Sequence, residues 1–371
     1  MGIFSKAVSS KLRYTCNSYV SRCVRQQNYV QRPVLVAEDR NKLILVGRNT
    51  KENVYVSYLM TLSSLNGGRH FSLGKMKDFT ATTEPFVIGS SCGGILLLED
   101  ALCQGKSFFW NPLTDEYMAL PPSFSPRPGS AYSMQFAFSG IGLGAGPVDY
   151  KVVRVASFTE EDDDETYIET TKYFELYSLK NNSWRLVTQP SCGMFPNPLY
   201  NHLSLNGACH WVANGNGENM CILSFDFADE TFSHLTLPST SDNLLVQPLC
   251  LVNYDGLLGV VVMWEDMMRL EVLVWAEGGW TKVWCFDVSG VQCPLGIWGR
   301  DKCFLRGTGG ELLLFDGATG VLGPVDVGDD IDAIFLLPYV ESEATVNEHR
   351  GPHLEVNLCN LKIFDSNRRG L

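Results

Sequence analysis

Five strand–turn–strand units recur along the chain, and this recurrence constrains the fold more than any other feature. In chain order they are SFFWNPLTDEYMALP (107–121), FELYSLKNNSWRLV (174–187), ILSFDFADETFSHLTLP (222–238), EVLVWAEGGWTKVW (271–284) and LLLFDGATGVLGPVDV (312–327). Each has an apolar run, a turn rich in Asn, Asp, Gly or Thr, and a second run with a bulky residue near its start. This pattern is typical of β-hairpins.

The spacing of the units indicates a repeat of four strands. The equivalent points Phe109, Phe174, Phe225, Trp275 and Phe315 lie about 65, 51, 50 and 40 residues apart, and the longest step contains an acidic insertion. Further apolar runs with a central Gly or Asn-Gly precede the later units, as in SLNGACHWVANGN (204–216). Such turns suit positive φ angles. The sequence therefore predicts an all-β fold, a β-propeller-like (kelch-like) domain of about six blades, with a β-sandwich as the weaker alternative.

Two further structural expectations follow from this reading. A strand around 334–340 is expected to close the propeller by pairing with one from 34–46. Five tryptophans are expected at matching places in their units, filling the spaces between blades: Trp110, Trp184, Trp211, Trp280 and Trp298.

Composition fits a chain with a large buried core. Of the 371 residues, 45% are apolar, and the longest apolar runs, such as Leu257–Trp264, are far shorter than the roughly 20 residues of a membrane-spanning helix. No leader with an apolar centre and a small-residue cleavage site opens the chain. We expect a soluble protein in the cytoplasm or the nucleus.

The twelve cysteines are scattered, and no two of them form a C-x-x-C pair. Several lie inside apolar strand-like runs, for example Cys92, Cys209, Cys221 and Cys303, where reduced cysteine acts as a small hydrophobe. Buried free thiols are predicted, in preference to disulfides or zinc ligands.

The net charge of −12 is unevenly distributed. Residues 1–37 contain six basic residues and no acidic one, so the remainder carries about −18. That balance argues against nucleic acid as the main partner.

Several blocks of the chain resemble, in order, the plant F-box-associated interaction domain, also labelled F-box/kelch-like. They include VIGSSCGGILLLED, WNPLTDEYMALP, NGACHWVANGNG, ILSFDFADETFSHLTLP and the closing LPYVES. The resemblance runs from about residue 34 to Ser342 and implies a basic N-terminal segment at 1–33, the interaction domain at 34–342 and a tail at 343–371. It also implies that an F-box docks on the Skp adaptor of a cullin ubiquitin ligase while the β domain holds the target protein.

The N-terminal segment departs from the family pattern. Arg13, Tyr14 and Cys16 are similar to the end of an F-box and are the candidate adaptor contacts, whereas its earlier helices and its tryptophan are absent from 1–33. A truncated F-box, an alternative start, an organellar transit peptide and a solvated extension all stay open.

No catalytic, cofactor or metal site is predicted. The six histidines show no metal-ligand spacing, and His210, beside Trp211, fits a packing role. The run GIGLGAGP (140–147) is similar to a dinucleotide fingerprint, but Pro147 and a strand-like run follow it, so it is interpreted as a loop between strands. The chain is expected not to be an enzyme.

The candidate partner-binding residues lie in the expected loops. They are Arg127, the acidic run Glu160, Glu161, Asp162, Asp163, Asp164 and Glu165, and the aromatic residues Phe195 and Tyr200. Exposed arginine and aromatic side chains are favoured anchors, and a solvated acidic loop suits a basic patch on a partner. Ordinary loop packing is the alternative for each.

Two functions remain open. One is a substrate-recognition subunit of a cullin-type (SCF) ubiquitin ligase, with target proteins, the Skp adaptor and the cullin as partners, and with no nucleic acid or membrane. The other is a stand-alone interaction module that no longer binds the adaptor.

Overall fold

The structure, a computed structural model, describes residues 42–346 except for thirteen gaps. The gaps are 66–67, 77–85, 101–105, 124–131, 145–148, 161–169, 191–193, 197–200, 215–219, 238–246, 265–268, 288 and 329. The described residues form six antiparallel sheets, which we call blades I to VI.

Blades I to III take the chain from residue 86 to residue 236. Blade I comprises β4 (Phe86–Cys92), β5 (Ile95–Asp100), β6 (Ser107–Asn111) and β7 (Glu116–Ala119). Blade II comprises β8 (Tyr132–Leu143), β9 (Tyr150–Glu160), β10 (Thr170–Ser178) and β11 (Ser183–Leu186). Blade III comprises β12 (Phe195–Pro196), β13 (His202–Leu205), β14 (Ala208–Asn214), β15 (Met220–Asp226) and β16 (Thr231–Thr236).

Blades IV to VI complete the ring. Blade IV comprises β17 (Gln247–Tyr254), β18 (Leu257–Trp264), β19 (Arg269–Ala276) and β20 (Gly279–Asp287). Blade V comprises β21 (Val291–Trp298), β22 (Lys302–Gly307), β23 (Leu312–Asp316) and β24 (Val321–Pro324). Blade VI comprises β25 (Ile331–Tyr339), β1 (Lys42–Asn49), β2 (Val54–Leu65) and β3 (Gly68–Lys75).

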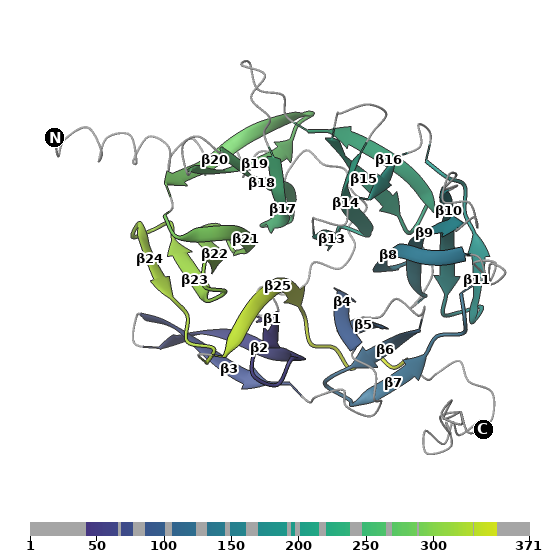
Figure 1. The fold of residues 1–371 in the computed structure, drawn as a ribbon, viewed down its shortest axis with the longest axis horizontal. Coiled ribbons are helices and arrows are strands. Elements are labelled where there is room, and N and C mark those ends of the chain that lie inside the picture. Colours follow the sequence, from purple (N-terminus) through teal and green to yellow (C-terminus); the bar gives the residue numbers. More distant parts are fainter. Residues whose placement is uncertain are drawn as a thin grey trace, which may run out of the picture.

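The blades form a six-bladed β-propeller, as the sequence predicts (Figure 1). The first strand of each blade, β13 in blade III, faces the centre of the ring. The five equivalent points of the repeat all lie on the third strand of their blades: Phe109 on β6, Phe174 on β10, Phe225 on β15, Trp275 on β19 and Phe315 on β23.

The first and last strands of the described chain close the ring. β25 pairs antiparallel with β1, from Lys42 opposite Tyr339 to Asn49 opposite Ile331. The predicted pairing of a strand around 334–340 with one from 34–46 is therefore confirmed. The inner strand of blade VI, β25, is the last strand of the described chain, and its other three strands, β1, β2 and β3, are the first three.

Apolar clusters fill the spaces between neighbouring blades. One cluster joins blades IV and V, where the rings of Phe286 and Phe315 stack with their centroids 4.0 Å apart. Comparable clusters join each of the other neighbouring pairs. The core is thus a ring of inter-blade layers, each of which requires both flanking blades.

The predicted positions of the tryptophans are partly wrong. Trp110 lies on a third strand, Trp184 and Trp280 on fourth strands, Trp211 on a second strand and Trp298 on a first strand. They therefore do not occupy matching places: the residue after the equivalent point is Trp110 in blade I, but Glu175 in blade II and Asp226 in blade III. All but Trp280 are nevertheless buried in inter-blade clusters, as expected.

The glycine run at 140–147 is not wholly a loop, contrary to prediction. Gly140 and Gly142 lie in β8, and both are packed against blade III. A Cβ atom on Gly140 would lie 2.8 Å from Cys209 Cβ, and one on Gly142 would lie 2.6 Å from Phe227 Cγ. The alternating glycines occupy one face of a strand, which side chains of the next blade approach too closely for any Cβ atom.

The cysteine prediction is confirmed within the described residues. All seven cysteines there are free; Cys209, Cys221, Cys250 and Cys303 are buried and Cys92 is half-buried, whereas Cys285 is exposed and departs from the predicted burial. The described ranges contain no helix with the length and apolarity needed to cross a membrane.

Candidate partner-binding face

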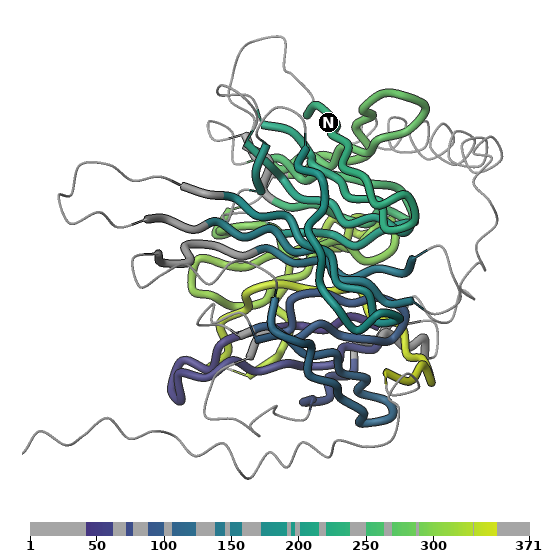
Figure 2. The backbone as a smooth tube through the Cα atoms, turned by 90° about the vertical axis from the view of Figure 1, so that its right-hand side faces the viewer, coloured from purple at the N-terminus to yellow at the C-terminus, as the bar shows by residue number. Residues whose placement is uncertain are grey.

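The propeller has two faces that differ in how its strands are connected. In blades I to V, the turns between the first and second strands and between the third and fourth strands emerge on one face, which we call the tight-turn face. The remaining connections emerge on the opposite face, which we call the loop face, because antiparallel neighbours turn at alternate ends. In Figure 2 the loop face lies on the left and the tight-turn face on the right.

The tight-turn face is built from short turns with residues at positive φ. Asn206-Gly207 and Asp255-Gly256 are two-residue turns in which both residues have positive φ, the pattern that suits hairpins. Asp115, with φ 55°, occupies the corresponding conformation in the turn of blade I. The sequence predicts these turns because Asn, Asp and Gly tolerate the left-handed region.

Hydrogen bonds tie neighbouring blades together across this face. The Tyr150 hydroxyl donates to the Gly93 carbonyl at 3.0 Å, joining blades II and I. The Asn206 amide donates to the Gly256 carbonyl at 2.9 Å, joining blades III and IV. The Arg300 guanidinium binds Asp255, joining blades V and IV. Such ties hold the tight-turn face in one arrangement.

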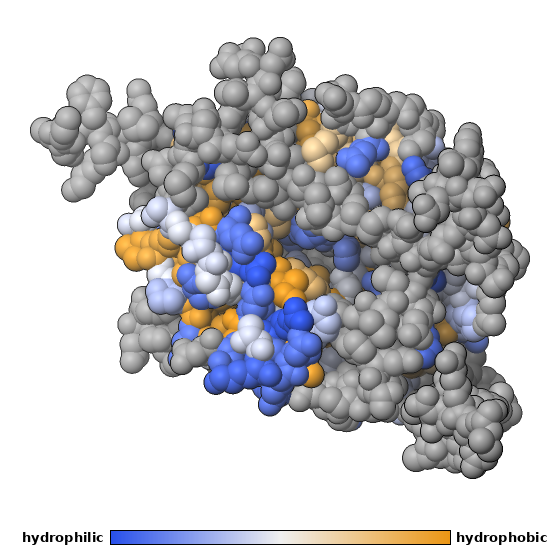
Figure 3. Space-filling view, viewed as in Figure 1, coloured by the Kyte–Doolittle hydropathy of each residue, from blue (hydrophilic) through white to orange (hydrophobic). Residues whose placement is uncertain are grey.

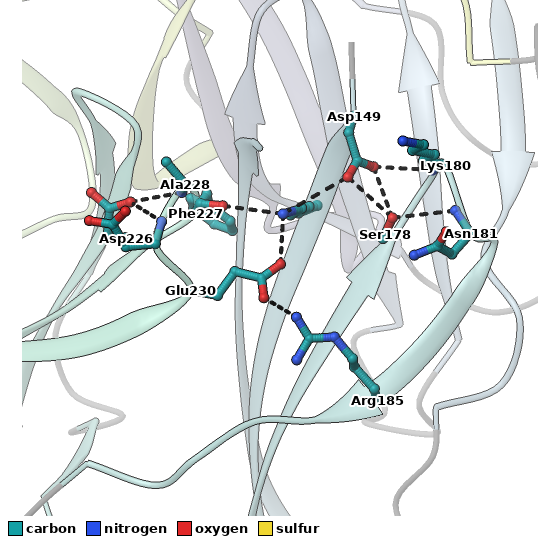
Figure 4. Close-up of polar contacts among 11 residues, drawn as sticks. Asp149, Ser178, Lys180, Asn181, Arg185, Asp226, Phe227, Ala228 and Glu230 are labelled. Carbon is teal, nitrogen blue, oxygen red and sulfur yellow. Dashed lines mark hydrogen bonds and ion pairs between the residues drawn. The ribbon is translucent and has the colours of Figure 1, made fainter. Parts of the chain in front are cut away.

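The most extensive tie is an ionic network between blades II and III (Figure 4). Lys151 Nζ, which is buried, donates to Glu230 Oε1 at 2.7 Å and to the Phe227 carbonyl oxygen at 3.3 Å. It also lies 3.9 Å from Asp149 Oδ2, and Arg185 pairs with the second oxygen of Glu230. The buried ammonium group is thus surrounded by acceptors from both blades.

The electrostatics of this network favour its charged form. Partial burial raises the pKa of Glu230, but the hydrogen bonds and charges of Lys151 and Arg185 outweigh that effect and hold the pKa below its usual value. The Asp149 carboxylate accepts hydrogen bonds from the Ser178 hydroxyl at 3.0 Å and from the Lys180 backbone N–H at 3.1 Å. The network is therefore structural, because its charges are satisfied by groups of the protein itself.

The loop face carries the longer connections. These are 76–85, 120–131, 161–169, 187–201 and 237–246, which exceed the two- to six-residue turns of the opposite face. β7, β9 and β11 each lead into one of these connections, so the ends of these three strands lie on the loop face. Of the predicted candidates, Glu160 and Phe195 are described, and both thus lie on the loop face.

Only part of the predicted set can be located. Arg127, 161–165 and Tyr200 lie outside the described residues, as do the adaptor candidates Arg13, Tyr14 and Cys16. Glu160 is the last residue of β9, opposite Tyr132 of β8. Binding through any of these residues stays a prediction.

Phe195 lies on the loop face, where its ring contacts blade II. It begins β12, a short strand that pairs with the end of β14 opposite Asn214. Its ring packs edge-on against Phe138 with a centroid distance of 5.6 Å, and Lys172 Nζ lies 4.9 Å from the ring centroid. The half-buried ring stabilises the border between blades II and III and exposes part of its surface beside a cation.

Another described part of the loop face, at the border between blades V and VI, is polar. Figure 3 shows hydrophilic residues there, with apolar residues beside them. Arg306 donates to both carboxylate oxygens of Asp332, from Nε at 2.8 Å and from Nη2 at 2.7 Å. The Ala333 N–H also donates to the Gly310 carbonyl at 2.9 Å, so this part of the face is fixed by bonds between the two blades.

Buried polar groups near the centre of the ring do not form a metal site. Burial raises the pKa of Glu99, while the Ser139 hydroxyl and the Arg154 guanidinium act in the opposite direction. Burial also lowers the pKa of His202 and of His210 to about 4. Among the described residues, no three His, Cys, Asp or Glu side chains are placed to hold a metal ion.

Two features were not predicted from the sequence. One is the ionic network, and the other is the pairing of Phe195 and Pro196 with β14 as the short strand β12. Lys151 stands near the start of the strand-like run DYKVVRV, and a lysine within a buried strand is the signal that a counter-charge must lie nearby. No comparable signal identifies Glu230 as its partner, because the two residues come from different blades.

Comparisons with known proteins agree with this architecture. Residues 71–283 match the family described as F-box associated beta propeller domain. F-box protein ETP2 of Arabidopsis thaliana is 25% identical over 239 residues, which cover 60% of this chain and 57% of that protein. F-box protein CPR1 of Arabidopsis thaliana is 28% identical over 221 residues, which cover 53% and 51%. The chain thus spans little more than half the length of these two relatives.

A solved oligogalacturonate lyase in complex with manganese overlaps with a TM-score of 0.44 at 11% identity, covering 79% of this chain and 83% of that one. The family match is the more informative finding, since it covers over half of the sequence and falls on the propeller. This chain belongs to the family of the F-box associated beta propeller domain.

Proposed function

We propose that this chain is a protein-binding receptor that recognises target proteins for a cullin-type ubiquitin ligase. It binds the target through the loop face and catalyses no reaction itself. The observation that carries the proposal is the contrast between the two faces, in a chain whose relatives are F-box proteins. Short, tied turns make one face rigid, while the other offers longer connections, where binding residues are normally found.

The proposed mechanism is one of proximity. A receptor that holds a target beside a ubiquitin-carrying enzyme raises the effective concentration of the target, so no nucleophile or general base is required. Arg127, the acidic run and the exposed part of Phe195 are the proposed target contacts, and Tyr200 joins them. Such a receptor works where the ligase works, so we also propose a cytoplasmic or nuclear location.

The test compares charge removal on the two faces. Tagged full-length protein is used to capture partners from plant extract, and the captured proteins are identified by mass spectrometry. Asp162→Asn, Asp163→Asn and Asp164→Asn together remove three charges from the loop connection. The control, Asp115→Asn, Asp229→Asn and Glu277→Asn, removes three charges from the tight-turn face.

We expect the loop variant to lose a captured target and the control variant to retain it. Equal capture by the two variants would contradict target binding through the acidic run. A third variant, Arg13→Ala with Tyr14→Ala and Cys16→Ala, separates the adaptor question. If the Skp adaptor is captured by neither wild type nor variant while the target is, the chain acts as a stand-alone interaction module.

A further inference from the structure

The chain continues past β25 as a strap that crosses from blade VI to blade I. We define the strap as residues 341–346, which run in an irregular conformation over the tight-turn face. The yellow end of the described chain lies on that face in Figure 2. The β25–β1 pairing closes the ring within blade VI, whereas the strap makes its contacts with residues of blade I.

Asn111, at the end of β6, binds the middle of the strap. Its side-chain amide donates to the Ser342 carbonyl at 2.9 Å and to the Ala344 carbonyl at 2.7 Å. Its Oδ1 accepts the Leu113 N–H at 2.9 Å, which fixes the orientation of the amide. Asn111 is fully buried, so both of its donors are committed to the strap.

The two hydrogen bonds from the Asn111 amide suit a bound segment with an extended backbone. Carbonyls of residues i and i+2 point to the same side of an extended segment, and Asn111 binds such a pair. Gly94 gives the backbone room to approach, because a Cβ atom there would lie 2.9 Å from the Ser342 nitrogen. Backbone contacts of this kind do not depend on the side chains of the bound segment.

Val346 provides the apolar anchor at the other end of the strap. Its side chain is 1% exposed and belongs to the cluster between blades I and II that includes Leu120 and Trp184. Its N–H donates to Glu116 Oε2 at 3.3 Å. Glu343, between these contacts, is exposed, and Glu341, just before them, pairs with Lys42 of β1. The strap is therefore held by one fully buried side chain, a few hydrogen bonds and an ion pair at its start.

We propose that this slot on blade I, formed by Gly94, Asn111, Glu116 and the cluster around Trp184, is a peptide-binding site that residues 342–346 occupy in cis. The site takes an extended segment with small residues at its first and third positions and an apolar β-branched residue at its fifth. The strap makes no strand pairing, so its release is a local opening that leaves the blades intact. The inference is independent of the loop face and of any ligase.

The test is binding of the strap segment in trans. A fluorescent peptide of residues 340–348, acetylated and amidated, is titrated into three full-length proteins: wild type, Val346→Asp and Val346→Asp with Asn111→Ala. We expect saturable binding to Val346→Asp, because its own strap has lost its anchor. Wild type should bind about tenfold more weakly, since its strap competes, and the double variant about tenfold more weakly, since two backbone hydrogen bonds are lost.

A matched control separates the slot from a general effect on the ring. Asn201 bridges blades III and IV in a similar way, with its amide donating to the Leu251 carbonyl and its Oδ1 accepting the Leu251 N–H. Asn201→Ala in the Val346→Asp background should leave peptide affinity unchanged. Absence of binding to folded Val346→Asp, or equal binding with and without Asn111, would overturn the proposal.

A second measurement applies if Val346→Asp does not fold. Hydrogen exchange of the wild-type protein is followed for the amide of Val346 and for the amides of β5 in blade I. An exchangeable strap loses its protection at denaturant concentrations that leave β5 protected. If the Val346 amide and the β5 amides lose their protection only together, at global unfolding, the strap is an inseparable part of blade I and the proposal is refuted.

Discussion

The absence of a side chain at two positions decides how closely blades II and III approach each other. Gly140 and Gly142 leave space on β8 that Cys209 and Phe227 of blade III fill. The spacing of these glycines is the two-residue period of a strand, since alternate residues face the same side. A pattern that is similar to a phosphate-binding fingerprint is thus explained by packing.

We expect Gly142→Ala to destabilise the protein by about 1–3 kcal/mol, because the added methyl group overlaps the Phe227 ring and forces the blades apart. Gly296→Ala is the control. It lies on β21, an inner strand, and its added Cβ atom would meet only Leu336 Cβ at 3.8 Å, an ordinary contact. Urea unfolding measures both changes, and equal midpoints for the two variants would contradict this account.

Two half-buried histidines, His202 and His210, make stability depend on pH. Burial lowers the pKa of His202 and of His210 to about 4, whereas an unfolded chain titrates near 6.5. Between these values the unfolded state binds more protons, so stability falls as pH drops from about 6.5 to about 4. The slope from each histidine reaches about 1.4 kcal/mol per pH unit.

His210→Asn tests this dependence, because it removes one titrating group and places an amide where Nδ1 contacts the Ser224 hydroxyl at 2.7 Å. We expect a shallower decrease in unfolding free energy between pH 6.5 and 4.5 than in wild type. His234→Asn, at an exposed position of β16, is the control. An unchanged slope in His210→Asn would show that the histidine does not resist protonation in the folded state.

At the scale of elements, the border between two blades depends on charge as well as on apolar contact. Lys151 comes from β9, and Glu230 from the turn that precedes β16. Because the ammonium group of Lys151 is buried, loss of its carboxylate partner leaves a poorly solvated charge. This pair therefore matters more than the exposed ion pairs of the surface.

We predict that Glu230→Gln destabilises the fold by about 1–2 kcal/mol, because the amide replaces a charged acceptor for both Lys151 and Arg185. Lys51→Met, which removes an exposed pair with Asp330, should change stability by less than about 0.5 kcal/mol. Thermal unfolding at low and high salt measures both. A larger loss of stability in Lys51→Met than in Glu230→Gln would contradict the greater importance of the Lys151–Glu230 pair.

The sequence reveals the elements whose signals are local and misses those that depend on neighbours. Turn residues such as Asp115 and Asn206 mark hairpins, so the repeat and a propeller of about six blades follow from the sequence. The strand character of Gly140 and Gly142 does not follow, because it depends on side chains of another blade. The same applies to Phe195, whose strand β12 exists only by pairing with β14.

At the scale of the whole molecule, stability depends on ring closure. β25 lies between β1 of its own blade and the neighbouring inner strands, and Leu337 belongs to the cluster that joins blades VI and I. The register of β25 with β1 links residues that are about as far apart in the sequence as the described chain allows. Damage to β25 therefore affects two blades at once.

We expect Leu337→Asp to destabilise the protein by more than about 3 kcal/mol, because it places a carboxylate in an apolar inter-blade layer. Pro338→Ser, at the adjacent exposed position of the same strand, should have little effect. Unfolding in urea, followed by tryptophan fluorescence and by circular dichroism, measures both. If Leu337→Asp retains wild-type stability, closure through β25 is not what holds the ring together.

The direction of β1 gives the molecule a polarity along its axis. Lys42 starts β1 on the tight-turn face, and Asn49 ends it on the loop face. Nine-residue β25, which runs beside β1, spans about 30 Å. Two partners that contact the opposite ends of β25 would therefore be held about 30 Å apart by the propeller, one on each face.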